Sequence, residues 1–191
     1  MRRLAWLGAM VLVLQSAVAA GSATANCEVA IMDFESLKIV FPSIPSIGNA
    51  YTEDGITVTA VQGDLAYAGT LSTSFAGSTM LFHHISLGLI VLTSAEGHVF
   101  DFLSIAIAEL PSFDSNGQPI NFGPFEITFV GTKVNGTTVS QTVTAEPFPV
   151  VTTFKMRGFS NVVSVQWRQG GGGAPGLSTH QFDNVVTRWH Q

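Results

Sequence analysis

The sequence predicts an all-β protein, an antiparallel two-sheet β-sandwich with jelly-roll-like topology. Three observations predict this fold. Turn-forming pairs of Gly, Asn, Asp and Pro recur at short intervals, as in Asp54-Gly55 and Asn135-Gly136. The runs between them are rich in β-branched and aromatic residues and often alternate apolar with polar side chains. No window beyond residue 25 shows convincing helical periodicity.

The N-terminal segment has the three parts of a cleavable signal peptide. Arg2 and Arg3 form a positively charged start, and residues 4–14 form an apolar stretch that is too short to span a bilayer. Small residues follow, with Ala-x-Ala patterns that end at Ala19 and at Ala25. We expect cleavage after Ala25, with Ala19 as the alternative.

The expected domain organisation is a signal peptide over residues 1–25 and a single β-sandwich domain over residues 26–191. Cys27 is the only cysteine, so the chain can form no internal disulfide and its core alone must hold the fold. No later run reaches 18 apolar residues, so we expect no membrane insertion after signal cleavage. The expected location is secreted or periplasmic.

Two internal strands show clear alternation. Residues 103–108 place large apolar side chains on odd positions and small ones on even positions, and residues 125–129 alternate apolar with polar side chains. Because successive side chains on a strand point to opposite faces, each strand is expected to have one core face. Asn135-Gly136 then predicts a hairpin with a type I′ turn, in which both central residues take a positive φ.

The C-terminal part supplies two more strands. Residues 163–167 alternate so that Val163, Val165 and Trp167 share a face, which is predicted to be the core face. Gln166 and its neighbour Arg168 then face the opposite side, where they are able to hydrogen-bond a ligand. The run 181–189 is predicted to be the last strand.

Charge excludes two classes of partner. Charged residues make up only 11% of the chain and the formal net charge is −5. Loss of the leader removes Arg2 and Arg3 but no acid, so the mature domain is still more acidic. An acidic domain with few cations lacks the basic surface that nucleic acids and anionic membranes require, and we exclude both.

A family resemblance rests on short motifs in a fixed order. The motifs are residues 33–37, 51–56, 100–105, 108–110, 129–133, 158–167 and 180–186. On these motifs the chain is similar to exported bacterial β-sandwich proteins of the PEP-CTERM-associated type, which resemble galactose-binding-like jelly rolls. This resemblance implies the same fold. The chain ends at residues 189–191 without that family's sorting tail, so its mature form is expected to be free in the periplasm or outside the cell.

Three acids are candidate ligands for a structural Ca²⁺. Glu35 is predicted on the first strand and Asp183 on the last, and in galactose-binding-like jelly rolls those strands are usually neighbours. Asp54 would add a third carboxylate from a loop. Calcium takes 6–8 oxygen ligands, and backbone carbonyls would complete the set. The alternative is that Glu35 and Asp183 cap turns or accept hydrogen bonds from backbone amides.

Motifs for other chemistry are missing. The five histidines show no metal-binding spacing, and adjacent His83 and His84 point to opposite faces of a strand. There is no nucleophile-elbow motif, and a catalytic pocket is rarely built at a flexible terminus such as the one that carries Cys27. A pair of acids suited to glycoside hydrolysis cannot be recognised from sequence alone. We therefore expect no enzymatic activity, and rank a hydrolase third among the possible functions.

The leading functional hypothesis is a secreted non-catalytic binding module for extracellular or envelope carbohydrate. Sugar rings stack on aromatic side chains, and Tyr51 and Tyr67 lie near predicted loops, where ligand contacts concentrate. The alternative is a structural or adhesive protein of the envelope or matrix that has no small-molecule ligand. The two differ in whether several aromatic side chains are exposed together on one concave face.

Overall fold

The computed structural model describes residues 28–37, 45–69, 72, 74–84, 87–120, 123–170 and 179–189. The predicted signal peptide and Cys27 lie outside the described residues. The described part of the chain is all-β, and every strand pair is antiparallel. No described helix is long and apolar enough to span a membrane. The predicted fold class, an antiparallel two-sheet sandwich, is confirmed.

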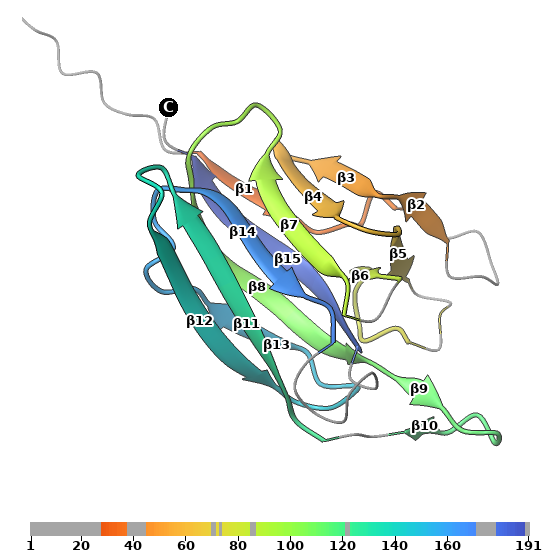
Figure 1. The fold of residues 1–191 in the computed structure, drawn as a ribbon. Helices are drawn as coiled ribbons and strands as arrows, with labels where there is room; N and C mark the ends of the chain where they lie inside the picture. The colour runs from red at the N-terminus through yellow and green to blue at the C-terminus, as the bar shows by residue number, and fades with distance from the viewer. Residues whose placement is uncertain are drawn as a thin grey trace, which may run out of the picture.

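The front layer is a sheet of six strands. It faces the viewer in Figure 1. Its polar face is open, whereas its apolar face packs on the second layer. In order across the sheet, its strands are β3 (Ala50–Glu53), β4 (Ile56–Ala60), β7 (Leu89–Ser94), β14 (Val162–Arg168), β11 (Phe125–Lys133) and β12 (Thr138–Ala145).

The back layer is built around the last strand, β15 (Thr179–Trp189), with β8 (Phe100–Leu110) along one edge. The first strand, β1 (Val29–Met32), pairs with the C-terminal part of β15, as predicted for the first and last strands. In the described chain the two layers are joined by one bridged pair, Val162 and Phe100. The remaining strands are β13 (Thr152–Lys155), β6 (Met80–His83), β5 (Leu65–Ala68) and β2 (Ser46–Gly48), with β9 (Ser112–Phe113) and β10 (Pro119–Ile120) forming a separate small ribbon.

A chain of aromatic rings joins the two layers through the core. Trp167 of β14 contacts Phe182 of β15 edge to face at 5.2 Å, and it packs on Phe129 of β11 at 5.3 Å between ring centroids. Phe129 in turn lies 6.0 Å from Phe102 of β8. Such pairs add about 0.5–1.5 kcal/mol each beyond the area that they bury. With no disulfide available, this core holds the sandwich together.

Two hairpins show where the turn prediction was right and where it was wrong. The β11–β12 hairpin forms at Asn135-Gly136 as predicted, but Asn135 does not take a positive φ. Gly136 N–H donates to the Lys133 carbonyl, which is a type I turn followed by a bulge at Gly136. The Asn135 side chain bonds the backbone N–H of Thr137 instead. The type I′ turn lies in the β3–β4 hairpin, where Asp54 and Gly55 both have positive φ.

The predicted core face of β14 is correct for Val165 and Trp167 and wrong for Val163. Trp167 is buried, whereas Val163 is 36% exposed and Val162 is buried in its place. The cause is a register shift in the β11–β14 ladder, where Lys133 pairs with Val162 and the alternation slips.

β8 departs from the expectation of a single core face. Ala106 and Ala108 are buried, although they point away from the neighbouring buried residues Ile105 and Ile107. The segment 74–79 crosses this side, because the adjacent β15 side chain of Gln181 donates to the Ser74 carbonyl. The outer surface of the back layer is therefore covered here, which leaves the front layer as the more open sheet.

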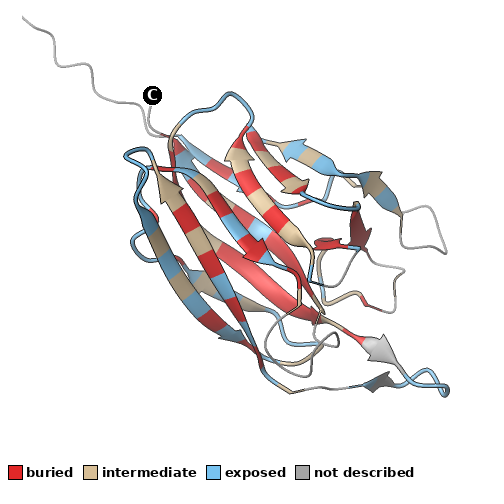
Figure 2. Cartoon of the chain, in the orientation of Figure 1, coloured by how far each residue is buried: buried red, intermediate tan, exposed pale blue. Residues whose placement is uncertain are grey.

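The open face of the front layer carries a row of hydroxyl side chains that crosses the whole sheet. One residue from each strand contributes, and the strand registers place each beside the next. None is buried, and Figure 2 shows the alternation of buried and more exposed residues along these strands. The row consists of Thr52, Thr57, Thr93, Ser164, Thr132 and Thr138.

Candidate functional site

A cavity of about 340 Å³ lies at one end of the sandwich, where both ends of the described chain meet two turns. The start of β1, the β3–β4 turn, the loop after β7 and the last residue of β15 form its walls. We call it the end cavity. Its lining residues are Glu28, Val29, Ala30, Asp54, Gly55, Ser94, Glu96, His98 and Trp189.

Backbone hydrogen bonds fix the walls of the end cavity. Ala95 N–H donates to the Gly55 carbonyl at 2.9 Å and so ties the loop after β7 to the β3–β4 turn. Trp189 N–H donates to the Glu28 carbonyl at 2.8 Å, which holds the end of β15 against the residue before β1. The site is thus built on a tight hairpin turn and on paired strands, which position side chains more rigidly than a long loop does.

The indole of Trp189 forms an aromatic wall of the end cavity. Gly55 lies so close that an added Cβ would be 3.3 Å from Trp189 Cζ2. The Phe100 ring packs on the indole at 6.0 Å and the His98 imidazole meets it edge-on at 6.3 Å. Trp189 is 9% exposed, so it presents a small apolar surface to a ligand while most of its ring anchors the wall.

Acidic side chains surround this aromatic wall. Glu28, Asp54 and Glu96 are exposed carboxylates, and His98 Nε2 lies 3.4 Å from Glu96 Oε2. The described lining residues include no Lys or Arg. The end cavity therefore offers hydrogen-bond acceptors, one imidazole and an indole within one hollow.

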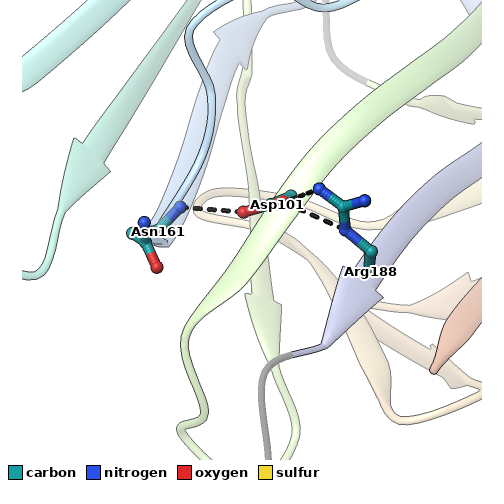
Figure 3. Close-up of polar contacts among 3 residues, drawn as sticks. All are labelled: Asp101, Asn161 and Arg188. Atoms are coloured by element: carbon teal, nitrogen blue, oxygen red, sulfur yellow. Dashed lines mark hydrogen bonds and ion pairs between the residues drawn. The ribbon is translucent and has the colours of Figure 1, made fainter. Parts of the chain in front are cut away.

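The guanidinium of Arg188, the residue before Trp189, is engaged elsewhere. Its Nε and Nη2 both donate to Asp101 Oδ2 of β8, at 3.1 and 2.5 Å, and Asp101 Oδ1 accepts from the Asn161 backbone N–H (Figure 3). Successive residues on a strand face opposite sides, so Arg188 points away from the side of β15 that carries Trp189. Its charge is balanced by Asp101.

A second hollow, of about 390 Å³, lies on the open face of the front layer. Gln166 and Arg168 of β14 are exposed there, as predicted from their alternation with Trp167. Glu126 and Thr128 of β11 lie beside them. The hollow presents polar side chains to solvent, but its Trp167 is buried at 1% exposure and offers no open ring.

The two tyrosines predicted to bind ligand lie on different layers and outside both hollows. Tyr51 of β3 is half-buried; its hydroxyl shares a hydrogen bond of 2.7 Å with Ser36 Oγ, and burial raises its pKa. Tyr67 of β5 is 5% exposed and belongs to the core. Tyr67 was predicted to bind ligand from its place near a loop, but its ring lies in the core, because all four residues of β5 are buried.

The predicted metal ligands separate into two places. Asp183 is on β15 as expected, but Glu35 lies in the turn that follows β1, and not on the strand itself. These two carboxylates hold the segment that crosses the back layer: Thr79 N–H donates to Glu35 Oε1 at 3.0 Å and Ser78 Oγ to Asp183 Oδ2 at 2.6 Å. Asp54 lines the end cavity instead.

Asp183 is electrostatically coupled to its acidic neighbours. Burial raises its pKa to about 6, and the nearby charges of Glu35 and Asp33 push it in the same direction. Hydrogen bonds from Ser78 and Asn184 act against the shift. Among the described residues, no group of three or more His, Cys, Asp or Glu side chains is placed to hold a metal ion. The pair supplies two carboxylates of the 6–8 oxygens that calcium takes, and both already accept protein hydrogen bonds.

Sequence reasoning missed the end cavity. Glu28, Asp54, His98 and Trp189 are far apart in the sequence, and of these only Asp54 was singled out there, as a candidate calcium ligand. The one local signal was the Glu96-x-His98 turn between two strands, together with a tryptophan at the end of the last strand. The pairing of β1 with β15 brings Glu28 to Trp189, and the pairing of β4 with β7 brings the β3–β4 turn to the loop after β7.

Comparisons with solved structures return carbohydrate-binding modules at low similarity. A family 32 module from C. perfringens NanJ, in complex with galactose, has 16% identity and a TM-score of 0.43, and the match covers 72% of this chain and 98% of that chain. A family 29 module has 10% identity and a TM-score of 0.39, with 85% and 89% covered. A family 29 variant complexed with mannohexaose has 9% identity and a TM-score of 0.38. No family model and no curated protein matches the chain.

Proposed function

We propose that this domain is a non-catalytic carbohydrate-binding module and that the end cavity is its binding site. The observation that carries the proposal is the indole of Trp189 in one hollow with three carboxylates and the His98 imidazole. A sugar ring has an apolar face that packs on an aromatic side chain, and its hydroxyls donate to carboxylates. The cavity, at about 340 Å³, is within the range of small-ligand sites.

The exposure of the acids supports binding over hydrolysis. A glycosidase keeps its acid carboxyl in an apolar environment that is poor in water. Glu28, Asp54 and Glu96 are all exposed, and the Glu96 side chain is 77% exposed. The arrangement suits recognition of hydroxyl groups in contact with solvent.

We further propose that the domain works outside the cytoplasm, on extracellular or envelope glycans, after removal of residues 1–25. The positively charged start, the short apolar stretch and the Ala-x-Ala sites support export. Intact-mass analysis of the exported protein is expected to give a chain that begins near Asn26, or near Ala20 for the alternative site. Recovery of only the full-length chain would contradict this.

A glycan array followed by calorimetry tests carbohydrate binding. His98→Ala removes an exposed side chain of the end cavity and is expected to weaken binding of any glycan hit by about tenfold, which is typical for one lost polar contact. His84→Ala is the matched control, because His84 is similarly exposed and pairs with Asp64 away from the cavity. Binding that is lost equally in both variants, or no binding to any glycan, would refute the proposal.

The hydroxyl row on the front layer favours a second candidate function, adhesion through the open sheet face. Uncharged Thr and Ser side chains cross all six strands, and Thr52 and Thr57 bond to each other at 2.8 Å. Thr93→Lys and Thr132→Lys place charges in the middle of the row. If the sheet face is the adhesive surface, these variants abolish retention on an insoluble polysaccharide and His98→Ala does not.

A further inference from the structure

The charges of the end cavity point beyond carbohydrate binding in general. Three carboxylates line it, from the residue before β1, the β3–β4 turn and the loop after β7. One imidazole, His98, lies beside Glu96, and the neighbouring guanidinium of Arg188 is bound by Asp101. The lining thus has a surplus of negative charge that its own cationic side chains do not balance.

The spacing of these acids argues against a metal ion as the balancing charge. Calcium requires oxygens at about 2.3–2.6 Å around one point, and the described acids of the cavity form no such group. The hollow of about 340 Å³ is also much larger than an ion. An organic cation the size of a sugar ring, with several hydrogen-bonding groups, fits both the separation of the acids and the volume of the cavity.

We infer that the end cavity is selective for glycans that carry a protonated amine, such as glucosamine units, over neutral or N-acetylated glycans. This inference rests on the proposed function. An ammonium group donates three hydrogen bonds, which carboxylates accept strongly. The electron-rich indole of Trp189 is a further attraction for a cation in the same hollow.

Asp54→Asn is the most informative variant, because it removes one charge without breaking the turn. Asn followed by Gly is the preferred pair for a type I′ turn, so the β3–β4 hairpin is retained. Glu146→Gln is the matched control. It removes the same charge from an exposed residue that follows β12, at the opposite end of the sandwich by strand register.

The experiment is calorimetric titration of the mature domain with two tetrasaccharides that differ only at nitrogen, one of glucosamine and one of N-acetylglucosamine. At about pH 6 the free amine is protonated. We expect the glucosamine tetramer to bind at least about tenfold more tightly. Asp54→Asn is expected to reduce this ratio severalfold, because it weakens binding of the amine form more than binding of the N-acetylated form, whereas Glu146→Gln preserves the ratio.

The outcomes separate this inference from the proposed function. Equal affinity for the two tetramers, or an equal effect of Asp54→Asn and Glu146→Gln, overturns the amine preference and leaves glycan binding intact. A glycan array with no hits overturns both. Binding of a lysine-rich peptide in the absence of any binding to glucosamine tetramer would show that the cavity takes a peptide cation, and would also overturn the inference.

Discussion

Arg188 and Asp101 form a two-donor ion pair between β15 and β8, the two long strands of the back layer. Arg188 Nη2 and Nε both reach Asp101 Oδ2 at 2.5 and 3.1 Å, and the Asp101 side chain is only 5% exposed. The second carboxylate oxygen accepts from the Asn161 backbone, so one buried acid joins β15, β8 and the turn before β14. Arg188 directly precedes Trp189, the residue that forms the aromatic wall of the end cavity.

Asp101→Asn is expected to destabilise the domain by about 2 kcal/mol, because it breaks a largely buried ion pair. This is less than the full cost of breaking a buried pair, since Arg188 is 44% exposed. Urea unfolding measures the change. Glu96→Gln, which breaks the exposed pair with His98, is the control and should cost less than about 1 kcal/mol. Equal losses in the two variants would contradict the assignment.

Two buried groups should give the domain opposing pH dependences. Between about pH 4 and pH 6 the folded state holds a proton on Asp183 that the unfolded state has lost, so stability falls as pH rises. His180 is fully buried and its pKa is lowered to about 3, so the unfolded state holds the extra proton and stability rises with pH up to about 6.5. Each slope is about 1.4 kcal/mol per pH unit.

We therefore expect the stability of the unmodified domain in chelator to change little between about pH 4 and 6, where the slopes from Asp183 and His180 offset each other. Asp183→Asn should leave a stability that rises with pH, and His180→Leu one that falls. Urea unfolding at several pH values tests this. A steep slope in the unmodified domain, with no change in either variant, would show that other groups control the pH response.

Calcium binding by Glu35 and Asp183 stays a prediction, with a direct thermal test. A divalent ion would offset the burial and repulsion that raise the pKa of Asp183. We expect a higher melting midpoint in calcium than in chelator, and a gain of about 2.7 kcal/mol at 100 times the dissociation constant. Asp183→Asn should abolish most of this difference. Equal melting midpoints in calcium and in chelator would refute calcium binding by Glu35 and Asp183.

Gly131 of β11 is expected to tolerate no side chain, for reasons of space alone. A Cβ there would lie 2.8 Å from Phe159 Cδ1 and 3.1 Å from Val139 Cγ1. Gly131→Ala should therefore cost about 1–3 kcal/mol through overpacking. Gly117→Ala is the comparison, because that site is open and only its positive φ opposes a side chain, at about 1 kcal/mol. Urea midpoints compare the two, and a smaller loss at Gly131 would be inconsistent with this packing.

Local patterns predicted the strands well and the turns less well. The alternation of residues 125–129 reports directly on which face is buried, and β11 follows it. Asn135-Gly136 and Asp54-Gly55 look equivalent in sequence, yet only Asp54-Gly55 forms the type I′ turn. The Asn135 side chain accepts a hydrogen bond from the Thr137 backbone N–H. The Asn-Gly pair alone does not determine whether this turn or a type I′ turn forms.

The candidate site could not be predicted from local sequence patterns, because it depends on the pairing register of strands that are far apart in the sequence. Tyr67 was chosen for its place near a loop, but the burial of β5 from both sides is a property of the assembled sandwich. Trp189 gained its role from the pairing of β1 with β15 and from the bare backbone of Gly55 beside it. Likewise, Asp54 was predicted to bind calcium because of its charge, but the β3–β4 turn places it in the lining of the end cavity and not beside Glu35 and Asp183.

The pairing of β1 with β15 also determines when the molecule is able to finish folding. Val29 and Arg188 are register partners although they are at opposite ends of the described chain. Contacts between residues so distant in sequence close the longest loop, and their entropic cost makes folding slow. The end cavity is incomplete until β1 and β15 have paired, because Trp189 is held there by the Glu28 carbonyl. A chain whose two described ends have not yet met therefore lacks this hollow.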